Sequence, residues 1–164
     1  MAYFEDLRDC EHLPGSDGLG FQAVGWLQSG MDYRKGEVSD EFFEKLVILL
    51  QNPWAPPIAT VGIHLCDLCR FSGGRAEFHC HFGKTSLRRY QFSGVGNGFL
   101  FVPSGKNLFV SPSNIAHYID AHQYCPPPEF QKAVLNCPAM RSSEYLRTLL
   151  ATPAKEWLRR LKGV

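Results

Sequence analysis

Two pairs of side chains, far apart in the sequence, most constrain what this chain can fold into. Cys66 and Cys69 are separated by two residues in GIHLCDLC, and His117 and His122 by four in SNIAHYIDAHQYC. Two thiolates and two imidazoles at such local spacings are the ligand set of tetrahedral zinc sites. The pattern therefore predicts one metal site, with zinc as the cofactor, that joins two distant segments of the fold.

A third histidine competes for this predicted site. In an extended segment, side chains two residues apart point to the same side, so His64 could replace His117 beside Cys66. In a regular helix, positions five apart lie about 140° from each other, so His117 and His122 share one ion only if the last turn is distorted. The candidate metal ligands are therefore Cys66, Cys69, His117, His122 and His64.

Two other interpretations of the same residues stay open. The thiols could be a reduced pair packed near hydrogen-bonded core histidines, or a redox-active pair. A redox pair of the thioredoxin type opens a helix, whereas no helical pattern follows Cys69.

A separate cluster, His79, Cys80 and His81, alternates at the period of a half-buried strand, which directs the thiol away from both imidazoles. We interpret it as two exposed histidines around a core cysteine.

The composition is typical of one globular domain. With 164 residues, 45% of them hydrophobic, the chain is long enough to build a core, so we expect a single domain over residues 1–164. The net charge is +1, with 17 basic and 16 acidic side chains, so no overall basic field favours nucleic-acid binding.

The cysteine content and the first residues bear on the compartment. Six cysteines in a chain whose start lacks a signal-peptide pattern favour free thiols or metal ligands over disulfides. No apolar run reaches the length that a membrane-spanning helix requires. We therefore expect a cytoplasmic protein with no membrane partner.

The pattern of apolar residues and turn signals predicts an α+β fold. We expect a central antiparallel sheet with flanking helices and a C-terminal helical segment, pinned by the zinc site. The expected strands are near 21–27, at 58–64, at 78–82 and 85–92, and in a hairpin of 99–102 and 107–110. We expect a helix over 40–51 with Ser39 as its N-cap. A second helix should run from Ser111 as N-cap and Pro112 as first helical residue to about Gln123. Further helices are expected at 129–135, at 143–150 and from Pro153 onward.

Four stretches carry a resemblance to a known family: YFEDL at residues 3–7, VGWL at 24–27, GIHLCDLC at 62–69 and HYIDAHQYCPPPEF at 117–130. With their GxHxCxxC and HYIxxHxYxPPxxF patterns, they resemble an uncharacterised bacterial protein family, a domain of unknown function. The resemblance covers most of the chain except residues 71–97. It implies no activity, only that the five candidate ligands form one polar cluster.

The ligand set favours a non-catalytic function. Four protein ligands close the coordination sphere of zinc and leave no place for water or substrate. We therefore expect a zinc-stabilised interaction or regulatory domain, with an unidentified protein as its partner and no catalytic residues.

The alternative is a zinc-dependent hydrolase, in which three of the five candidates bind the metal and a water takes the fourth position. Asp67 or Asp120 would then be the general base by position, although the motifs HExxH and His-x-Glu with Pro-Cys-x-x-Cys are both lacking.

Nucleic-acid binding would use Arg88, Arg89, Tyr90 and the basic C-terminal helix. We interpret the cations of that helix as its solvated face, opposite an apolar stripe.

Overall fold

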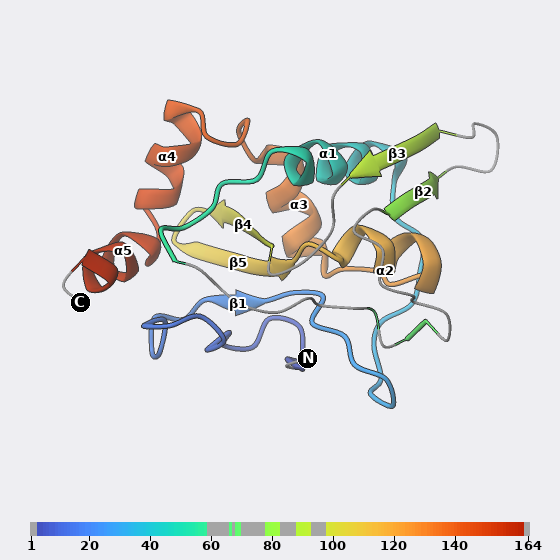
Figure 1. Cartoon of the computed structure of the whole chain (residues 1–164), viewed down its shortest axis with the longest axis horizontal. Helices are drawn as coiled ribbons and strands as arrows, with labels where there is room; N and C mark the ends of the chain where they lie inside the picture. Colours follow the sequence, from blue (N-terminus) through green and yellow to red (C-terminus); the bar gives the residue numbers. More distant parts are fainter. Residues whose placement is uncertain are drawn as a thin grey trace.

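The computed structural model describes residues 3–58, 66, 68, 69, 78–82, 88–92 and 98–162, with the main chain only for 78–82 and 88–92. Within these residues the chain forms five strands and five helices (Figure 1). Their bounds are β1 (Gln22–Ala23), α1 (Asp40–Gln51), β2 (Phe78–Phe82), β3 (Arg88–Phe92), β4 (Phe99–Ser104), β5 (Asn107–Pro112), α2 (Ile115–His122), α3 (Pro128–Asn136), α4 (Ser143–Leu150) and α5 (Ala154–Lys162).

The fold is α+β and contains a three-stranded mixed sheet of order β1-β5-β4. β4 and β5 form the predicted antiparallel hairpin, and Gly105 takes the positive φ of 60° that its two-residue turn requires. β1 pairs with β5 in parallel, with Gln22 opposite Phe109, so the sheet is not antiparallel throughout as expected. β2 and β3 form a separate antiparallel pair that contacts α2 and α1.

Helix α1 forms where the sequence predicts it. The Ser39 hydroxyl accepts a hydrogen bond from the Phe42 N–H at 3.2 Å, which caps the first turn. Most apolar side chains of this helix, including Phe43 and Leu46, are buried in a core that also contains β4, β5 and α3, whereas Ile48 is exposed. The rings of Phe42 and Phe130 meet edge to face at 6.4 Å, which fixes α1 against α3.

The prediction for the start of α2 is wrong by several residues. Ser111 and Pro112 continue β5, opposite Leu100 and Phe99, and the helix begins only at Ile115. The Ser113 N–H extends this pairing by donating to the Gly98 carbonyl at 2.9 Å. Cross-strand hydrogen bonds therefore outweigh the local helix-start signal of Ser-Pro.

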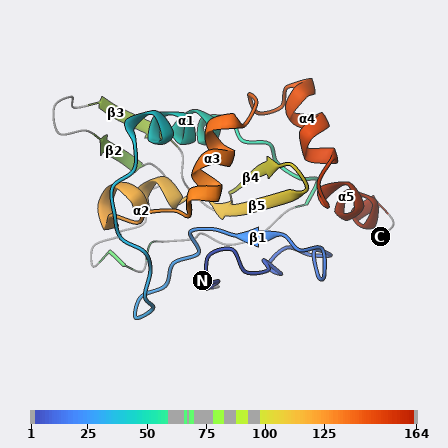
Figure 2. The same cartoon turned by 180° about the vertical axis from the view of Figure 1, so that it is seen from behind.

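The two C-terminal helices pack onto the sheet. The Tyr145 hydroxyl on α4 donates to the buried Phe101 carbonyl at 2.9 Å, and the indole of Trp157 on α5 donates to the Pro14 carbonyl at 2.8 Å. Figures 1 and 2 show α4 and α5 at one end of the molecule, with α2 and the β2–β3 pair at the other. These helices therefore stabilise the end of the sheet that lies away from α2.

Some expected elements have a different status. The strand expected near 21–27 is formed only by Gln22–Ala23. The strand expected at 58–64 lies outside the described residues except for Ile58, which belongs to no strand. None of the helices in the described ranges combines the length and apolar character needed to cross a membrane.

Candidate metal centre

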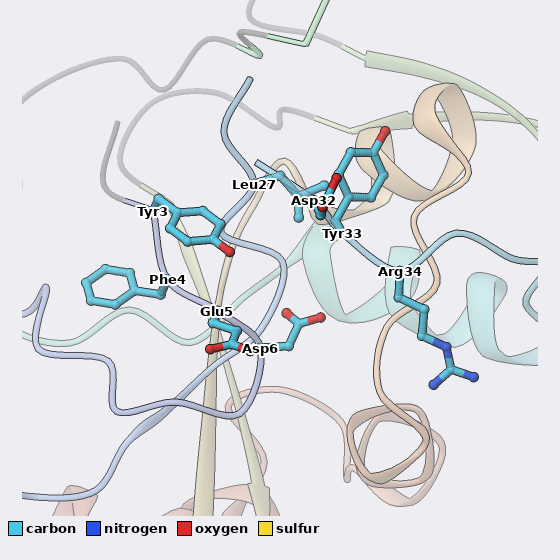
Figure 3. Close-up of a pocket in the computed structure, with 8 residues that line it drawn as sticks. All are labelled: Tyr3, Phe4, Glu5, Asp6, Leu27, Asp32, Tyr33 and Arg34. Atoms are coloured by element: carbon cyan, nitrogen blue, oxygen red, sulfur yellow. The ribbon is translucent and has the colours of Figure 1, made fainter. Parts of the chain in front are cut away.

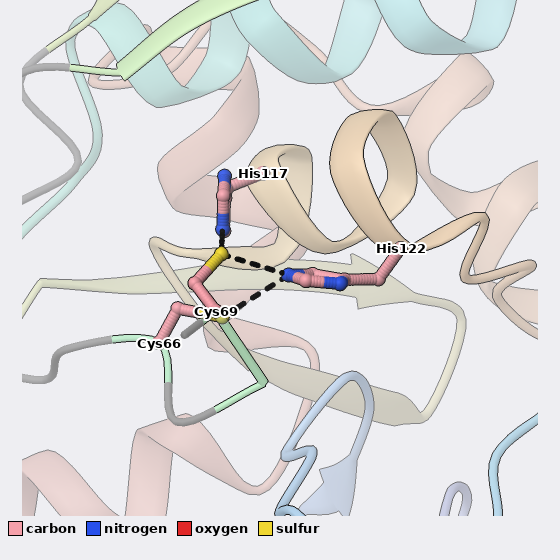
Figure 4. Close-up of side chains that lie close together, drawn as sticks. All are labelled: Cys66, Cys69, His117 and His122. Atoms are coloured by element: carbon pink, nitrogen blue, oxygen red, sulfur yellow. Dashed lines mark hydrogen bonds between the residues drawn. The ribbon is translucent and has the colours of Figure 1, made fainter. Parts of the chain in front are cut away.

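Four of the five candidate ligands lie together in the structure. One donor atom from each of Cys66, Cys69, His117 and His122 lies within 4.8 Å of all the others. The Cys69 sulfur is 3.2 Å from Nε2 of both histidines, and the Cys66 sulfur is 3.3 Å from Nε2 of His122. Figure 4 shows the two imidazoles reaching from α2 toward the pair of sulfurs. These residues could hold a single metal ion.

Helix α2 supplies both imidazoles because its last turn is wider than a regular α-helical turn. The N–H of Gln123 bonds to the Tyr118 carbonyl, five residues back instead of four, and Gln123 has a left-handed φ of 56°. The ring centroids of His117 and His122 lie 5.1 Å apart with their planes at 85°. This confirms that the helix end is distorted, as sharing of one ion requires.

A loop from the N-terminal part of the chain holds this helix end in place. The hydroxyl of Tyr33 donates to the carbonyl of His122 at 3.3 Å. The N–H of Gly36 donates to the carbonyl of Gln123 at 3.0 Å. Since these bonds reach the main chain next to the imidazole, residues 33–36 set the position from which His122 meets the sulfurs.

The imidazoles have the protonation state that a metal requires. Burial, together with the neighbouring His122, lowers the pKa of His117 to about 4. Burial also lowers the pKa of His122, with a further contribution from the charge of Lys35. Both rings are therefore neutral at pH 7, so each can direct a nitrogen lone pair at a cation.

The turn between the two cysteines prepares Cys66 to act as a thiolate ligand. Burial raises the pKa of Cys66 to about 12, whereas the N–H groups of Leu68 and Cys69, which hydrogen-bond its sulfur, act in the opposite direction. N–H donors stabilise a negatively charged sulfur more than a neutral thiol. A bound cation would offset the free-energy cost of burying the Cys66 thiolate, because its positive charge lies next to the negative sulfur.

The distances fit tetrahedral zinc. Zinc bonds of about 2.3 Å to sulfur and 2.0 Å to nitrogen at tetrahedral angles place each sulfur about 3.5 Å from each nitrogen. Three of the four sulfur–nitrogen distances are 3.2 to 3.3 Å, a few tenths of an ångström shorter. Small outward movements of the side chains would therefore accommodate the ion.

Comparison with known proteins places the chain in a family. A family model described as a domain of unknown function, DUF7919, matches residues 2–135. The chain belongs to the DUF7919 family. All four clustered residues lie in the matched stretch, whereas α4 and α5 lie beyond it. No curated protein and no solved structure matched the chain in the corresponding comparisons.

The remaining candidate residues of this DUF7919 domain differ in how far the structure describes them. His64 and Asp67 fall outside the described residues, as do the side chains of 79–81. Asp120 belongs to α2 and is not part of the cluster of described ligand atoms. Cys10 and Cys137 are core residues, exposed by 1% and 2%, and pack there as small hydrophobic side chains.

Sequence reasoning missed the residues that support the metal cluster. Tyr33 and Gly36 belong to no motif, and nothing in their local spacing indicates contact with α2. For Asp6 and Tyr124, whose side chains bond to each other, a signal existed. Both lie in stretches that carry the family resemblance, so their presence there could have indicated a shared role in the DUF7919 fold.

Proposed function

We propose that this chain is a zinc-stabilised, non-catalytic domain that functions in interaction with, or regulation of, another protein. The convergence of four donor atoms carries this proposal. Cys66 and Cys69 precede the histidines that they contact by 48 to 56 positions. An ion bound by all four would connect the segment around residues 66–69 to α2.

The donor set favours zinc over other cations. Thiolates exclude the hard cations magnesium and calcium, which prefer oxygen ligands. Two sulfurs and two imidazole nitrogens in a compact tetrahedron are a typical zinc environment, and zinc needs no redox partner.

The number of ligands favours a structural role over hydrolysis. A hydrolytic zinc keeps one position open for water, whereas four side chains fill a tetrahedral sphere. Hydrolysis would require one of the four to leave and a carboxylate to approach as general base. The completeness of the set therefore supports a domain whose fold, rather than chemistry, depends on zinc.

The size of the metal contribution indicates why the ion would matter for this fold. A structural zinc site contributes free energy on the order of 10 kcal/mol to folding in small domains. The total stability of an ordinary domain is only about 5–15 kcal/mol. Zinc would thus decide whether α2 and the 66–69 segment stay together.

Metal analysis and chelation test the proposal. The purified full chain should contain one zinc ion per molecule, and a zinc chelator should lower its melting temperature in a way that added zinc reverses. Activated ester and phosphoester substrates should be hydrolysed no faster by the zinc-loaded protein than by buffer. Absence of bound metal would contradict the proposal, as would a chelator-sensitive hydrolysis with an unchanged melting temperature.

A further inference from the structure

A cleft of about 320 Å³ lies beside the loop that supports the helix end of the metal centre. Its walls come from the first residues of the chain and from residues 32–34, which Figure 3 shows facing one another. Tyr33 belongs to both places, because it lines the cleft and also donates to the carbonyl of His122. The cleft is at the small end of the range for ligand sites, about 300–1,000 Å³.

The cleft carries an excess of negative charge. Glu5, Asp6 and Asp32 line it together with one cation, Arg34, so three carboxylates oppose one guanidinium. Glu5 already pairs with Arg8 at 3.4 Å on the exposed side of the chain. Asp6 and Asp32 are therefore the carboxylates that remain for a ligand.

Asp6 is half-buried, whereas Glu5 and Asp32 are exposed. Its carboxylate accepts the Tyr124 hydroxyl at 2.8 and 2.9 Å and the Gly25 N–H at 2.9 Å. It forms no ion pair with any residue that the structure describes. A carboxylate can accept about four hydrogen bonds, so these two donors leave acceptor capacity for a ligand on this half-buried group. Burial, with a smaller effect of the neighbouring Glu5, raises the pKa of Asp6.

Aromatic rings also line the cleft. Tyr3 and Tyr33 line the cleft together with Leu27, which adds an apolar wall, and Figure 3 shows the ring of Tyr33 beside Asp32. The faces of aromatic rings attract cations. Tyr33 already shows this preference, because the ammonium group of Lys35 lies 5.4 Å from its ring centroid.

We propose that this cleft binds a small organic cation, an ammonium group on a compact apolar body. Asp6 and Asp32 provide the opposing charge, and the rings of Tyr3 and Tyr33 enclose the apolar part. An anionic ligand would instead meet the carboxylate excess. The site goes beyond the proposed zinc function, and its test does not use metal affinity.

The direct test is a titration of the isotopically labelled, zinc-loaded full chain, followed by amide NMR signals at pH 7 and low salt. The probes are benzylamine, which is protonated at this pH, and benzyl alcohol, a neutral molecule of nearly the same shape. Benzylamine should shift the signals of residues 3–6 and 32–34 saturably, with a dissociation constant of about 1 mM or lower. Benzyl alcohol should bind about tenfold more weakly, because it lacks the charge.

Variants assign the binding to these carboxylates. Asp6→Asn should weaken benzylamine binding about tenfold, provided that its melting curve shows a folded protein. Asp32→Asn changes an exposed residue and should weaken binding about threefold. The matched control Asp9→Asn removes the same charge from an exposed position outside the cleft and should leave the affinity unchanged.

Three results would overturn the proposal. The first is equal affinity for benzyl alcohol and benzylamine. The second is the same loss of affinity in Asp9→Asn as in Asp32→Asn, which would indicate only a long-range charge effect. The third is the absence of saturable shifts at residues 3–6 and 32–34.

Discussion

Cys69 and His117 are 48 positions apart in the chain, yet the sulfur of one lies 3.2 Å from Nε2 of the other. Closing a loop of this length costs chain entropy on the order of 3 kcal/mol. A thiol is a weak hydrogen-bond donor, and a neutral hydrogen bond contributes about 1 kcal/mol, so thiol–imidazole bonds alone offset little of this cost. A shared metal ion would offset it several times over.

Replacing Cys69 should abolish stoichiometric zinc binding. Cys69→Ala removes the sulfur that contacts both histidines, so the variant should melt at the temperature of the chelated wild-type protein. The control Cys137→Ala changes a buried cysteine outside the cluster; it should retain zinc and cost about 1 kcal/mol of stability. Metal analysis of both variants checks this, and full zinc content in Cys69→Ala would refute the ligand assignment.

The hydroxyl of Tyr33 should tune zinc affinity through the main chain. Tyr33→Phe loses the hydrogen bond to the His122 carbonyl and should lower zinc affinity about fivefold while the stoichiometry stays at one ion. Competition with a chromophoric chelator measures the change. Tyr3→Phe removes a hydroxyl from the same cleft and should leave zinc affinity unchanged. Equal affinities of Tyr33→Phe and wild type would mean that the loop does not position His122.

Asp6 should give the stability a definite dependence on pH. Its pKa in the folded protein is raised above the ordinary 3.8, mainly by burial, so the folded state takes up a proton at higher pH than the unfolded state does. Wild-type stability should therefore rise relative to Asp6→Asn as the pH falls through the folded pKa toward 3.8. Urea unfolding of both proteins between pH 7 and pH 4 measures the difference, and since both share the metal site, zinc loss cancels. A difference that shrinks on acidification would show that the folded pKa is lowered instead.

The C-terminal helices should be necessary for the fold although they lie beyond residues 2–135. Trp157 is completely buried, packs edge to face against Phe21 at 5.4 Å and donates to the Pro14 carbonyl. Trp157→Ala should cost about 3–5 kcal/mol in urea unfolding. Arg159→Ala, at a side chain 67% exposed, should change stability by less than about 0.5 kcal/mol. Similar stabilities of the two variants would mean that α5 is dispensable.

Local signals in the sequence were sufficient for part of the fold. The cap at Ser39 and the apolar stripe after it predicted α1 with its observed bounds, and two apolar runs around Gly105 predicted the β4–β5 hairpin. Both depend on neighbours within a few residues. The parallel pairing of Gln22 with Phe109 and the late start of α2 depend on contacts across the sheet, which local patterns do not encode.

The same distinction applies to the metal centre. Each cysteine and histidine pair is recognisable because its members are close in sequence, and the two pairs share one chemistry. The supporting bonds join residues 89 positions apart for Tyr33 and His122, and 118 apart for Asp6 and Tyr124. A hydrogen bond between residues so far apart in the sequence leaves no periodic pattern of residues. These bonds could therefore be identified only from the structure.

X-ray absorption at the zinc edge of the purified full chain tests the central claim most directly. If Cys66, Cys69, His117 and His122 share one zinc ion, the first shell should contain two sulfur atoms at about 2.3 Å and two imidazole nitrogens at about 2.0 Å. A shell with fewer than two sulfurs, or one made only of oxygen and nitrogen, would contradict the account.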